Sequence, residues 1–236
     1  MNIVIDQGNT NLKLYYFKQN KIIKKNIFPI NNFNFFFNDN FDFVIYSTVS
    51  GYFSSIIDFF KNKIILFDLN SKIPIQNSYN SPTLGLDRLA AAVGAFSLFP
   101  DRNILIIDIG TAITFDIVLE NKKFIGGNIS PGIDARYRSL NSNTKNLPLI
   151  EDKSFNSAIF ADNTFDAIKN GIMYGILFEI QSYITYSLNN YDNLQIILTG
   201  GDAKFFENKL NFCMFVEPDL VAIGLNNILN YNTLIK

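Results

Sequence analysis

The pattern of apolar and polar positions predicts two successive series of strands with helices between and after them. In the first series, short β-rich runs are separated by turn residues, and one longer run is typical of a short helix. We expect strands at 2–5, 12–17, 21–28, 43–47 and 63–67, and a helix at 52–61. Strands mixed with helices in this way favour a mixed α/β sheet.

An Ala-rich segment at 86–99 predicts a buried helix that ends before Pro100. We place a domain boundary at this break, with an N-terminal domain at 1–101 and a C-terminal domain at 102–236. The extreme C-terminal helix is a candidate for packing back on the N-terminal domain.

The second series repeats the order of the first. We expect a strand at 104–109, a second strand that ends at Leu119, and a third that runs from Phe124 into "GGNISPG". A last buried strand at 194–198 ends in "TGGDA", and a helix is expected to begin near Ala203.

A long helix is predicted at 164–188, with Asp162 or Asn163 as its N-cap. Gly171 and Gly175 lie one turn apart in this helix, where another element could approach closely.

The internal repeat is visible in two short motifs, "DQGNT" at 6–10 and "DIGTA" at 108–112. Both consist of an apolar strand, an aspartate, any residue, a glycine and a small residue, which suggests a duplicated unit. Asp116 has no counterpart in the first copy, where Leu14 stands. It is either a solvent-facing hairpin residue or a supporting residue of a cleft.

Composition narrows the function classes. The chain has 236 residues, 48% of them apolar, and a formal net charge of −1 without blocks of like charge. We therefore expect a globular, cytoplasmic protein that binds neither nucleic acid nor membranes. The run "NNFNFFFNDNFDF" at 31–43 is expected to be a loop leading into a strand.

Cysteine and histidine usage narrows the chemistry further. The chain has one cysteine and no histidine, which rules out an internal disulfide, the usual zinc sites and histidine acid–base chemistry. A catalytic base must then be Asp, Glu, Lys or Tyr. We expect Cys213 to be a small buried apolar residue.

Each Asp-x-Gly motif suits a site that binds phosphate groups and a metal ion. A hairpin with glycine at its tip lets backbone N–H groups approach a polyphosphate, and an acid at the strand end can hold hydrated Mg²⁺. Lys13 could add positive charge to the first loop. A single loop of this kind is more often an ordinary turn, but two copies and the "TGG" turn together describe a nucleotide cleft between two related domains.

At this point the sequence resembles a known family. The two hairpins and the "TGG" turn resemble the phosphate and adenosine motifs of the superfamily of acetate kinase, sugar kinases and actin. Within it, "DQGNTNLKL" (6–14), "GLDR" (85–88), "DIGTAITFD" (108–116), "GGNISPG" (126–132) and "NTFDAIKNG" (163–171) together resemble type III pantothenate kinase. The resemblance implies a duplicated actin-like (ribonuclease H-like) fold with five-stranded mixed sheets flanked by helices.

The resemblance also implies roles for individual residues. Asp87 would be the catalytic base, Asp108 would bind a monovalent cation (K⁺ or NH₄⁺), and Asp6 would hold Mg²⁺ through water. The implied ATP contacts are Asp6, Gln7, Gly8, Asn9, Thr10, Asn11, Leu12, Lys13, Thr111, Gly200 and Gly201. The implied pantothenate contacts are Tyr79, Gly85, Leu86, Asp87, Arg88 and Thr164. A homodimer with sites at the interface is implied as well, with "GGNISPG" near the interface and the wall of the active site.

Taken without the other motifs, Asp87 and Arg88 would more simply form a surface ion pair or a helix cap. Two other functions are also weighed. The chain could be a kinase of the same superfamily that acts on a different small alcohol or carboxylate, against which "GLDR" and "GGNISPG" argue. It could instead be a non-catalytic nucleotide-binding regulator on the same fold, although Asp6, Asp87, Asp108 and Thr111 are all present.

Overall fold

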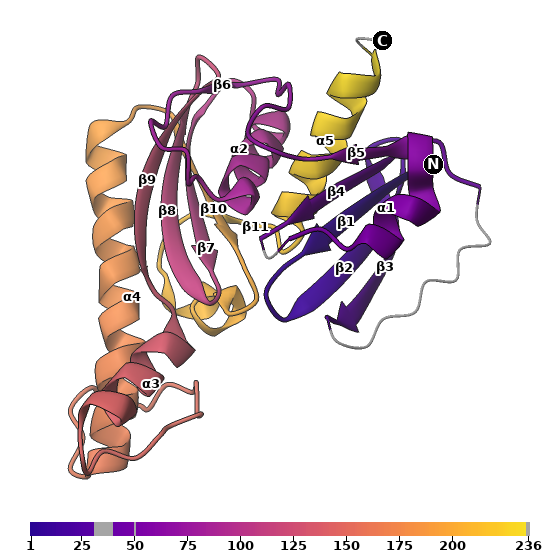
Figure 1. Ribbon diagram of the computed structural model, residues 1–236. Coiled ribbons are helices and arrows are strands. Elements are labelled where there is room, and N and C mark those ends of the chain that lie inside the picture. Colours follow the sequence, from indigo (N-terminus) through magenta and orange to yellow (C-terminus); the bar gives the residue numbers. More distant parts are fainter. Residues whose placement is uncertain (31–39, 50, 235–236) are drawn as a thin grey trace. The chain divides into compact units, whose positions relative to one another are not determined.

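The computed structural model describes residues 1–30, 40–49 and 51–234. The chain divides into two compact units (Figure 1). Unit 1 consists of Met1–Asp101, Glu120–Ile125 and Asp219–Lys236, and unit 2 of Arg102–Leu119 and Gly126–Pro218. Each unit is described by itself below.

Unit 1 is built on a five-stranded mixed sheet with the strand order β3-β2-β1-β4-β5. β1 and β2 form a hairpin, β3 continues the meander, and β4 and β5 run parallel to β1. The strands are β1 (Asn2–Gln7), β2 (Asn11–Lys18), β3 (Lys21–Pro29), β4 (Val44–Thr48) and β5 (Ile64–Leu66). All five strands predicted for the first series are confirmed to within a few residues.

The described part of unit 1 also contains three helices and one 3₁₀ turn. They are α1 (Ser54–Phe60), the 3₁₀ turn η1 (Lys61–Lys63), α2 (Leu86–Leu98) and α5 (Leu220–Leu234). Apolar side chains of β1, β2 and β4 pack with Ile56 and Phe60 of α1 in a continuous core. Although α5 is the last helix of the chain, it packs against α2 in this unit.

The α2–α5 crossing depends on glycine in both helices. A Cβ atom on Gly224 would lie 1.8 Å from the carbonyl oxygen of Ala90, and one on Gly94 would lie 2.4 Å from that of Leu220. Both clashes are with backbone, which cannot rotate away. The two helices therefore approach more closely than any side chain at these positions would allow.

Unit 2 repeats the strand order of unit 1, as β9-β8-β7-β10-β11. Its strands are β7 (Asn103–Ile109), β8 (Ala112–Leu119), β9 (Lys123–Pro131), β10 (Leu194–Thr199) and β11 (Phe215–Val216). A further short strand, β6 (Gln76–Asn77), pairs in parallel with Lys123 and Phe124 at the start of β9; these four residues belong to unit 1. The duplication that the repeated motifs predicted is confirmed, but β6 makes the second sheet six-stranded, where five strands were predicted.

The helices of unit 2 are α3 (Ile133–Asn143) and α4 (Thr164–Asn190), and α4 runs along the edge of the unit in Figure 1. Asn163 caps α4, because its side-chain oxygen accepts a hydrogen bond from the backbone N–H of Asp166 at 3.0 Å. The predicted long helix and its cap are confirmed. The helix expected near Ala203 is wrong, since two short 3₁₀ turns, η2 (Ala203–Phe205) and η3 (Glu207–Lys209), stand there.

The predicted alignment of Asp116 with Leu14 was wrong, because the two hairpins differ in length. Three residues connect β1 to β2, whereas two connect β7 to β8, so the second copy is one residue shorter at its tip. Asp116 pairs with Ile106 in the register that Tyr15 has with Val4. Tyr15, not Leu14, is therefore its counterpart, and Asp116 is 2% exposed and does not face solvent.

Two further predictions were wrong. A Cβ atom on Gly171 or on Gly175 would meet nothing within 4 Å, so none of the described elements of this chain packs against α4 at these positions. Cys213 is exposed, because the short segment before β11 lies at the surface.

Of the run at 31–43, residues 31–39 lie outside the described residues, and β4 begins after it at Val44. Among the described helices, none is long and apolar enough to cross a bilayer.

Candidate active site

The first hairpin of unit 1 presents a tight, glycine-containing turn. The backbone N–H of Gly8 donates to the carbonyl oxygen of Asn11 at 2.9 Å and closes the turn. Asn9 and Thr10 are exposed at the tip, and Lys13 lies opposite Asp6 in the strand register. The Lys13 Nζ atom is 3.8 Å from Asp6 Oδ2. The hairpin therefore has exposed polar residues at its tip and a charge pair at its base.

Two predicted loop residues have side chains that point into unit 1. Leu12 is fully buried, and Gln7 is 1% exposed. Gln7 Nε2 donates to the carbonyl oxygen of Gly51 at 3.0 Å, and Gln7 Oε1 accepts a hydrogen bond from the Tyr46 hydroxyl. Because both side chains are buried in unit 1, Gln7 and Leu12 could contact a nucleotide only through their backbone atoms.

Asp6 stands in an electrostatically unusual position. Burial raises the pKa of its carboxyl group, the Lys13 ammonium lowers it, and the Asp87 carboxylate raises it again. Asp87 is therefore close enough to Asp6 for the two negative charges to interact. Two acids that repel each other at one place are the setting in which a divalent cation stabilises a site most.

Asp87 is held at the start of α2 by its surroundings. Gly85 is the N-cap, and Asp87 Oδ1 accepts a hydrogen bond from the backbone N–H of Arg88 at 2.9 Å. A Cβ atom on Gly85 would lie 2.5 Å from the same oxygen, so a larger residue there would displace the carboxylate. This gives the "GLDR" motif a physical reason for its glycine.

Arg88 and Tyr79, both predicted substrate contacts, are brought together in unit 1. Arg88 is 7% exposed, and its guanidinium carbon lies 5.1 Å from the centroid of the Tyr79 ring. The Tyr79 ring in turn lies beside Phe124, with ring centroids 6.4 Å apart. The cation and the aromatic ring fix each other's position.

In unit 2 two of the other predicted motifs pack against the second hairpin. The Gly110 N–H donates to the Ala112 carbonyl oxygen at 3.0 Å, and Thr111 is exposed at the tip. The backbone N–H of Gly132 donates to the Thr111 carbonyl oxygen at 3.1 Å, and a Cβ atom on Gly132 would lie 2.1 Å from the Gly110 carbonyl oxygen. The "GGNISPG" segment thus packs against the hairpin tip through Gly132.

The "TGG" turn packs directly on Asp108. Gly200 has φ of +95°, and a Cβ atom there would lie 2.4 Å from Asp108 Oδ1 and 2.3 Å from the Ile109 carbonyl oxygen. The backbone N–H of Asp202 donates to the same Ile109 oxygen at 2.9 Å. Gly201 is exposed beside it. Only glycine fits both the conformation and the space at position 200.

Sequence reasoning missed Lys153, which stabilises this turn. Its Nζ atom lies 3.1 and 3.2 Å from the two carboxylate oxygens of Asp202 and 3.0 Å from Asp134 Oδ2. It thereby links the "TGGDA" turn to the first turn of α3. An isolated lysine outside any motif gives no signal in a single sequence.

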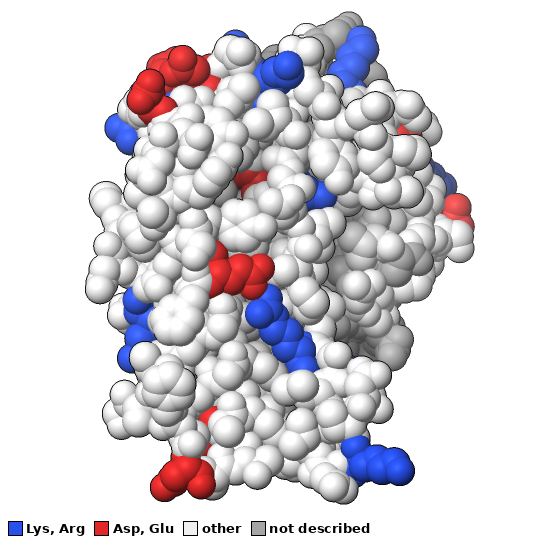
Figure 2. Space-filling view, turned by 90° about the vertical axis from the view of Figure 1, so that its left-hand side faces the viewer, with Lys and Arg blue, Asp and Glu red and all other residues white. Residues whose placement is uncertain are grey.

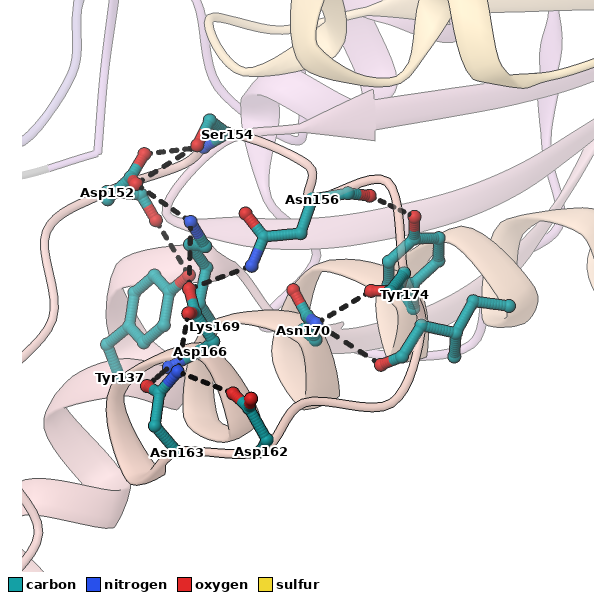
Figure 3. Close-up of polar contacts among 12 residues, drawn as sticks. Tyr137, Asp152, Ser154, Asn156, Asp162, Asn163, Asp166, Lys169, Asn170 and Tyr174 are labelled. Atoms are coloured by element: carbon teal, nitrogen blue, oxygen red, sulfur yellow. Dashed lines mark hydrogen bonds and ion pairs between the residues drawn. The ribbon is translucent and has the colours of Figure 1, made fainter.

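Thr164 is the first residue of α4 and is exposed. Its neighbours form a network of polar contacts at this end of the helix, with Lys169 at its centre (Figure 3). Lys169 Nζ lies 3.1 Å from Asp152 Oδ2 and 3.4 Å from Asp166 Oδ1. The start of α4 is therefore held rigidly, whatever Thr164 contacts.

The residue types present fit Mg²⁺ and a monovalent cation. Among the described residues no three His, Cys, Asp or Glu side chains gather in one place, so the protein offers no complete cage. Mg²⁺ in phosphate-transferring sites is typically held by one or two carboxylates, with water and phosphate oxygens completing its shell. Asp6 and Asp108, each at the end of a buried strand, can supply such oxygens.

Comparisons with known proteins place the chain in a family. The sequence model of type III pantothenate kinase matches residues 35–186. A type III pantothenate kinase from Christiangramia forsetii is 36% identical over 98% of this chain and 99% of its own length. One from Porphyromonas gingivalis is 35% identical over 98% of each chain.

Solved structures agree on the fold. A Baf-family protein from Campylobacter jejuni has a TM-score of 0.65 at 24% identity, covering 98% of this chain and 99% of that one. Component A of the (R)-2-hydroxyglutaryl-CoA dehydratase of Acidaminococcus fermentans has a TM-score of 0.52 at 16% identity, covering 100% and 99%. The predicted duplicated mixed α/β fold is confirmed.

Proposed function

The chain belongs to the type III pantothenate kinase family, and we propose that it transfers the γ-phosphoryl group of ATP to pantothenate. The product would be 4′-phosphopantothenate, in the first step of coenzyme A synthesis. The observation that carries the proposal is the electrostatic proximity of Asp87 and Asp6 in unit 1, with Lys13 beside Asp6. It brings an acid suited to activate a hydroxyl near a glycine turn suited to hold phosphates.

In the proposed reaction the primary hydroxyl oxygen of pantothenate attacks the γ-phosphorus, and the bond to the β,γ-bridging oxygen breaks to release ADP. Asp87 accepts the hydroxyl proton; the Arg88 N–H donates to its Oδ1 atom, and Gly85 leaves room for the carboxylate. Phosphoryl transfer depends mainly on alignment and on neutralising phosphate charge. Arg88 and Tyr79, which fix each other, are proposed to orient pantothenate together with Gly85, Leu86 and Thr164.

ATP would be bound by the hairpin at 6–13 in unit 1 and by Thr111, Gly200 and Gly201 in unit 2. Support comes from the exposed tips of both hairpins and from the close packing of Gly200 on Asp108. Mg²⁺ near Asp6 and a monovalent cation, K⁺ or NH₄⁺, at Asp108 would neutralise phosphate charge when bound. Because ATP is the proposed donor, we place the enzyme in the cytoplasm.

We also propose that the protein is a homodimer with its active sites at the interface. Figure 2 views the side of unit 2 that carries α4, and most of this surface is uncharged. On α4, Phe178 is 48% exposed and Tyr186 is 64% exposed. A largely uncharged helix face with exposed aromatic side chains suits contact with a second copy. Sedimentation showing only monomer at assay concentrations would contradict this part.

A turnover assay with pantothenate, ATP, Mg²⁺ and K⁺ tests the main proposal. We expect ADP release that depends on pantothenate, and loss of that release in Asp87→Asn with ATP binding unchanged. Asp58→Asn, which changes an exposed acid of α1, is the matched control and should retain full activity. ADP release with another small alcohol but not with pantothenate would identify a different kinase. No ADP release with any acceptor, despite ATP binding, would favour a regulator.

A further inference from the structure

The middle residue of the Asp-x-Gly motif differs in kind between the two hairpins. In unit 1 it is Gln7, whose side chain is 1% exposed, and in unit 2 it is Ile109, which is fully buried. The isoleucine shows that an apolar side chain is enough to fill this position in the fold. Burying a side-chain amide costs free energy unless it is hydrogen-bonded. Gln7 is therefore stable at this position only because of its hydrogen bonds.

The Gln7 amide is bonded at both ends to β4 and the segment that follows it. In the parallel pairing of β1 with β4 (Figure 1), Ile5 stands beside Tyr46 and Gln7 beside Thr48, so these side chains share one face of the sheet. The Tyr46 hydroxyl donates to Gln7 Oε1, and Gln7 Nε2 donates to the Gly51 carbonyl oxygen at 3.0 Å. The same Gly51 oxygen accepts a hydrogen bond from Thr48 Oγ1 at 3.1 Å.

The Tyr46 hydroxyl is itself held in place. Tyr46 is fully buried, and its hydroxyl oxygen accepts a hydrogen bond from the backbone N–H of Phe53, the N-cap of α1, at 3.1 Å. Its ring packs edge-on against Tyr52, with ring centroids 5.0 Å apart. Burial raises the pKa of Tyr46, so the hydroxyl stays protonated and remains a donor at neutral pH. This one hydroxyl therefore connects the start of α1 to Gln7.

Gln7 is connected to the hairpin turn through its own backbone. Its carbonyl oxygen accepts a hydrogen bond from the Val49 N–H at 3.2 Å. The same planar peptide group contains the Gly8 N–H, which closes the turn on the Asn11 carbonyl oxygen at 2.9 Å. A shift of this peptide would displace the Asp6 carboxylate on one side and the exposed tip of the turn on the other.

We propose that Tyr46 is a positioning residue for ATP: its hydroxyl, acting through the Gln7 amide, holds the first hairpin in the conformation that binds the phosphates. The inference rests on the proposed use of this hairpin for ATP. Tyr46 would not touch ATP or Mg²⁺ itself, because it lies on the opposite face of the sheet from Asp6, which pairs with Ser47. Without the hydroxyl, Gln7 loses this donor, and ordering the hairpin would consume more of the binding free energy of ATP.

Isothermal titration calorimetry of the full chain with Mg·ATP, in the absence of pantothenate, tests the effect on ATP. Tyr46→Phe removes only the hydroxyl, and we expect it to weaken Mg·ATP binding about three- to tenfold, the range that one hydrogen bond supplies. Tyr52→Phe is the matched control, because it also loses one hydroxyl bond, to the Phe67 carbonyl oxygen at 2.6 Å, without touching Gln7. It should lower the melting temperature but leave the affinity for Mg·ATP unchanged. Unchanged affinity in Tyr46→Phe, or an equal loss in Tyr52→Phe, would overturn the proposal.

A double variant tests whether Tyr46 acts through Gln7. Gln7→Met keeps the length of the side chain but removes both polar ends, and alone it should weaken Mg·ATP binding at least as much as Tyr46→Phe. In the Gln7→Met background, Tyr46→Phe should change the affinity by less than about twofold. Losses that simply add would refute this route.

The calorimetric result is separate from the proposed reaction, because it needs no turnover. If the parent chain binds Mg·ATP and the variants behave as expected, but pantothenate is not phosphorylated, the proposed acceptor is wrong and the role of Tyr46 stands. If pantothenate is phosphorylated and Tyr46→Phe binds Mg·ATP as the parent does, the role of Tyr46 is wrong and the proposed function stands. A parent chain that binds no Mg·ATP would refute both.

Discussion

Replacing Gly224 with alanine tests whether the α2–α5 crossing holds unit 1 together. In a helix interior, alanine is normally favoured over glycine by about 1 kcal/mol, so propensity alone predicts stabilisation. The structure predicts the opposite, because the new Cβ atom would lie 1.8 Å from the Ala90 carbonyl oxygen. Restoring an ordinary contact requires the helices to separate by about 1.5 Å, which opens packing along the whole crossing.

Overpacking of this kind costs roughly 1–3 kcal/mol or more, and a clash with backbone belongs at the upper end. We therefore expect Gly224→Ala to lower the free energy of unfolding by at least about 2 kcal/mol, after the gain in propensity. For a chain of this size the melting temperature should fall by several degrees, on the order of 5 °C. Urea unfolding would measure the free energy and a thermal scan the melting temperature, both followed by circular dichroism.

Gly171→Ala on α4 is the matched control. It is the same substitution within a helix, but its Cβ atom would meet nothing within 4 Å. We expect it to stabilise the protein by up to about 1 kcal/mol. If Gly224→Ala stabilised the protein as Gly171→Ala does, the close approach of α2 and α5 would be wrong.

Of four other predictions, three concern the candidate active site and the fourth concerns Asp166 at the start of α4. Asp87→Asn should lower kcat by about 10²–10⁴-fold without changing ATP affinity, since a general base contributes about that factor; near-normal turnover would remove Asp87 from its role. Gly200→Ala should raise the KM for ATP, because its Cβ atom would lie 2.4 Å from Asp108 Oδ1 in a left-handed conformation. Steady-state kinetics measures this KM, and an unchanged value would contradict the prediction. Lys153→Met should also raise the KM for ATP by freeing Asp202, and Lys153→Arg should restore it in part; equal kinetics for both variants would mean that the ion pair is dispensable. Folding lowers the pKa of Asp166, so its contribution to stability is present above its unfolded pKa and is lost as pH falls through its folded pKa; melting temperatures from pH 5 down to pH 2 should fall less in Asp166→Asn than in the parent, and parallel curves would contradict this.

The candidate site could be predicted from sequence where its chemistry is local. An aspartate before a glycine turn leaves a motif, and both hairpins form where "DQGNT" and "DIGTA" stand. The pairing of Arg88 with Tyr79 and the support of Asp202 by Lys153 join residues from separate elements. Neither leaves a periodic pattern, so the sequence named Arg88 and Tyr79 individually without their contact and did not name Lys153.

Sequence alone determined the local features of this protein. Strand periodicity, turn chemistry and capping act between neighbouring residues, which is why the positions of the strands along the chain and the Asn163 cap of α4 were predictable. Tertiary structure decided which residues from distant segments meet. It brings α5 onto α2, makes Gly224 rather than Gly171 the glycine without space for a side chain, and pairs Asp116 in the register of Tyr15. Packing and register depend on contacts between segments far apart in the chain, and a single sequence does not specify those contacts one by one.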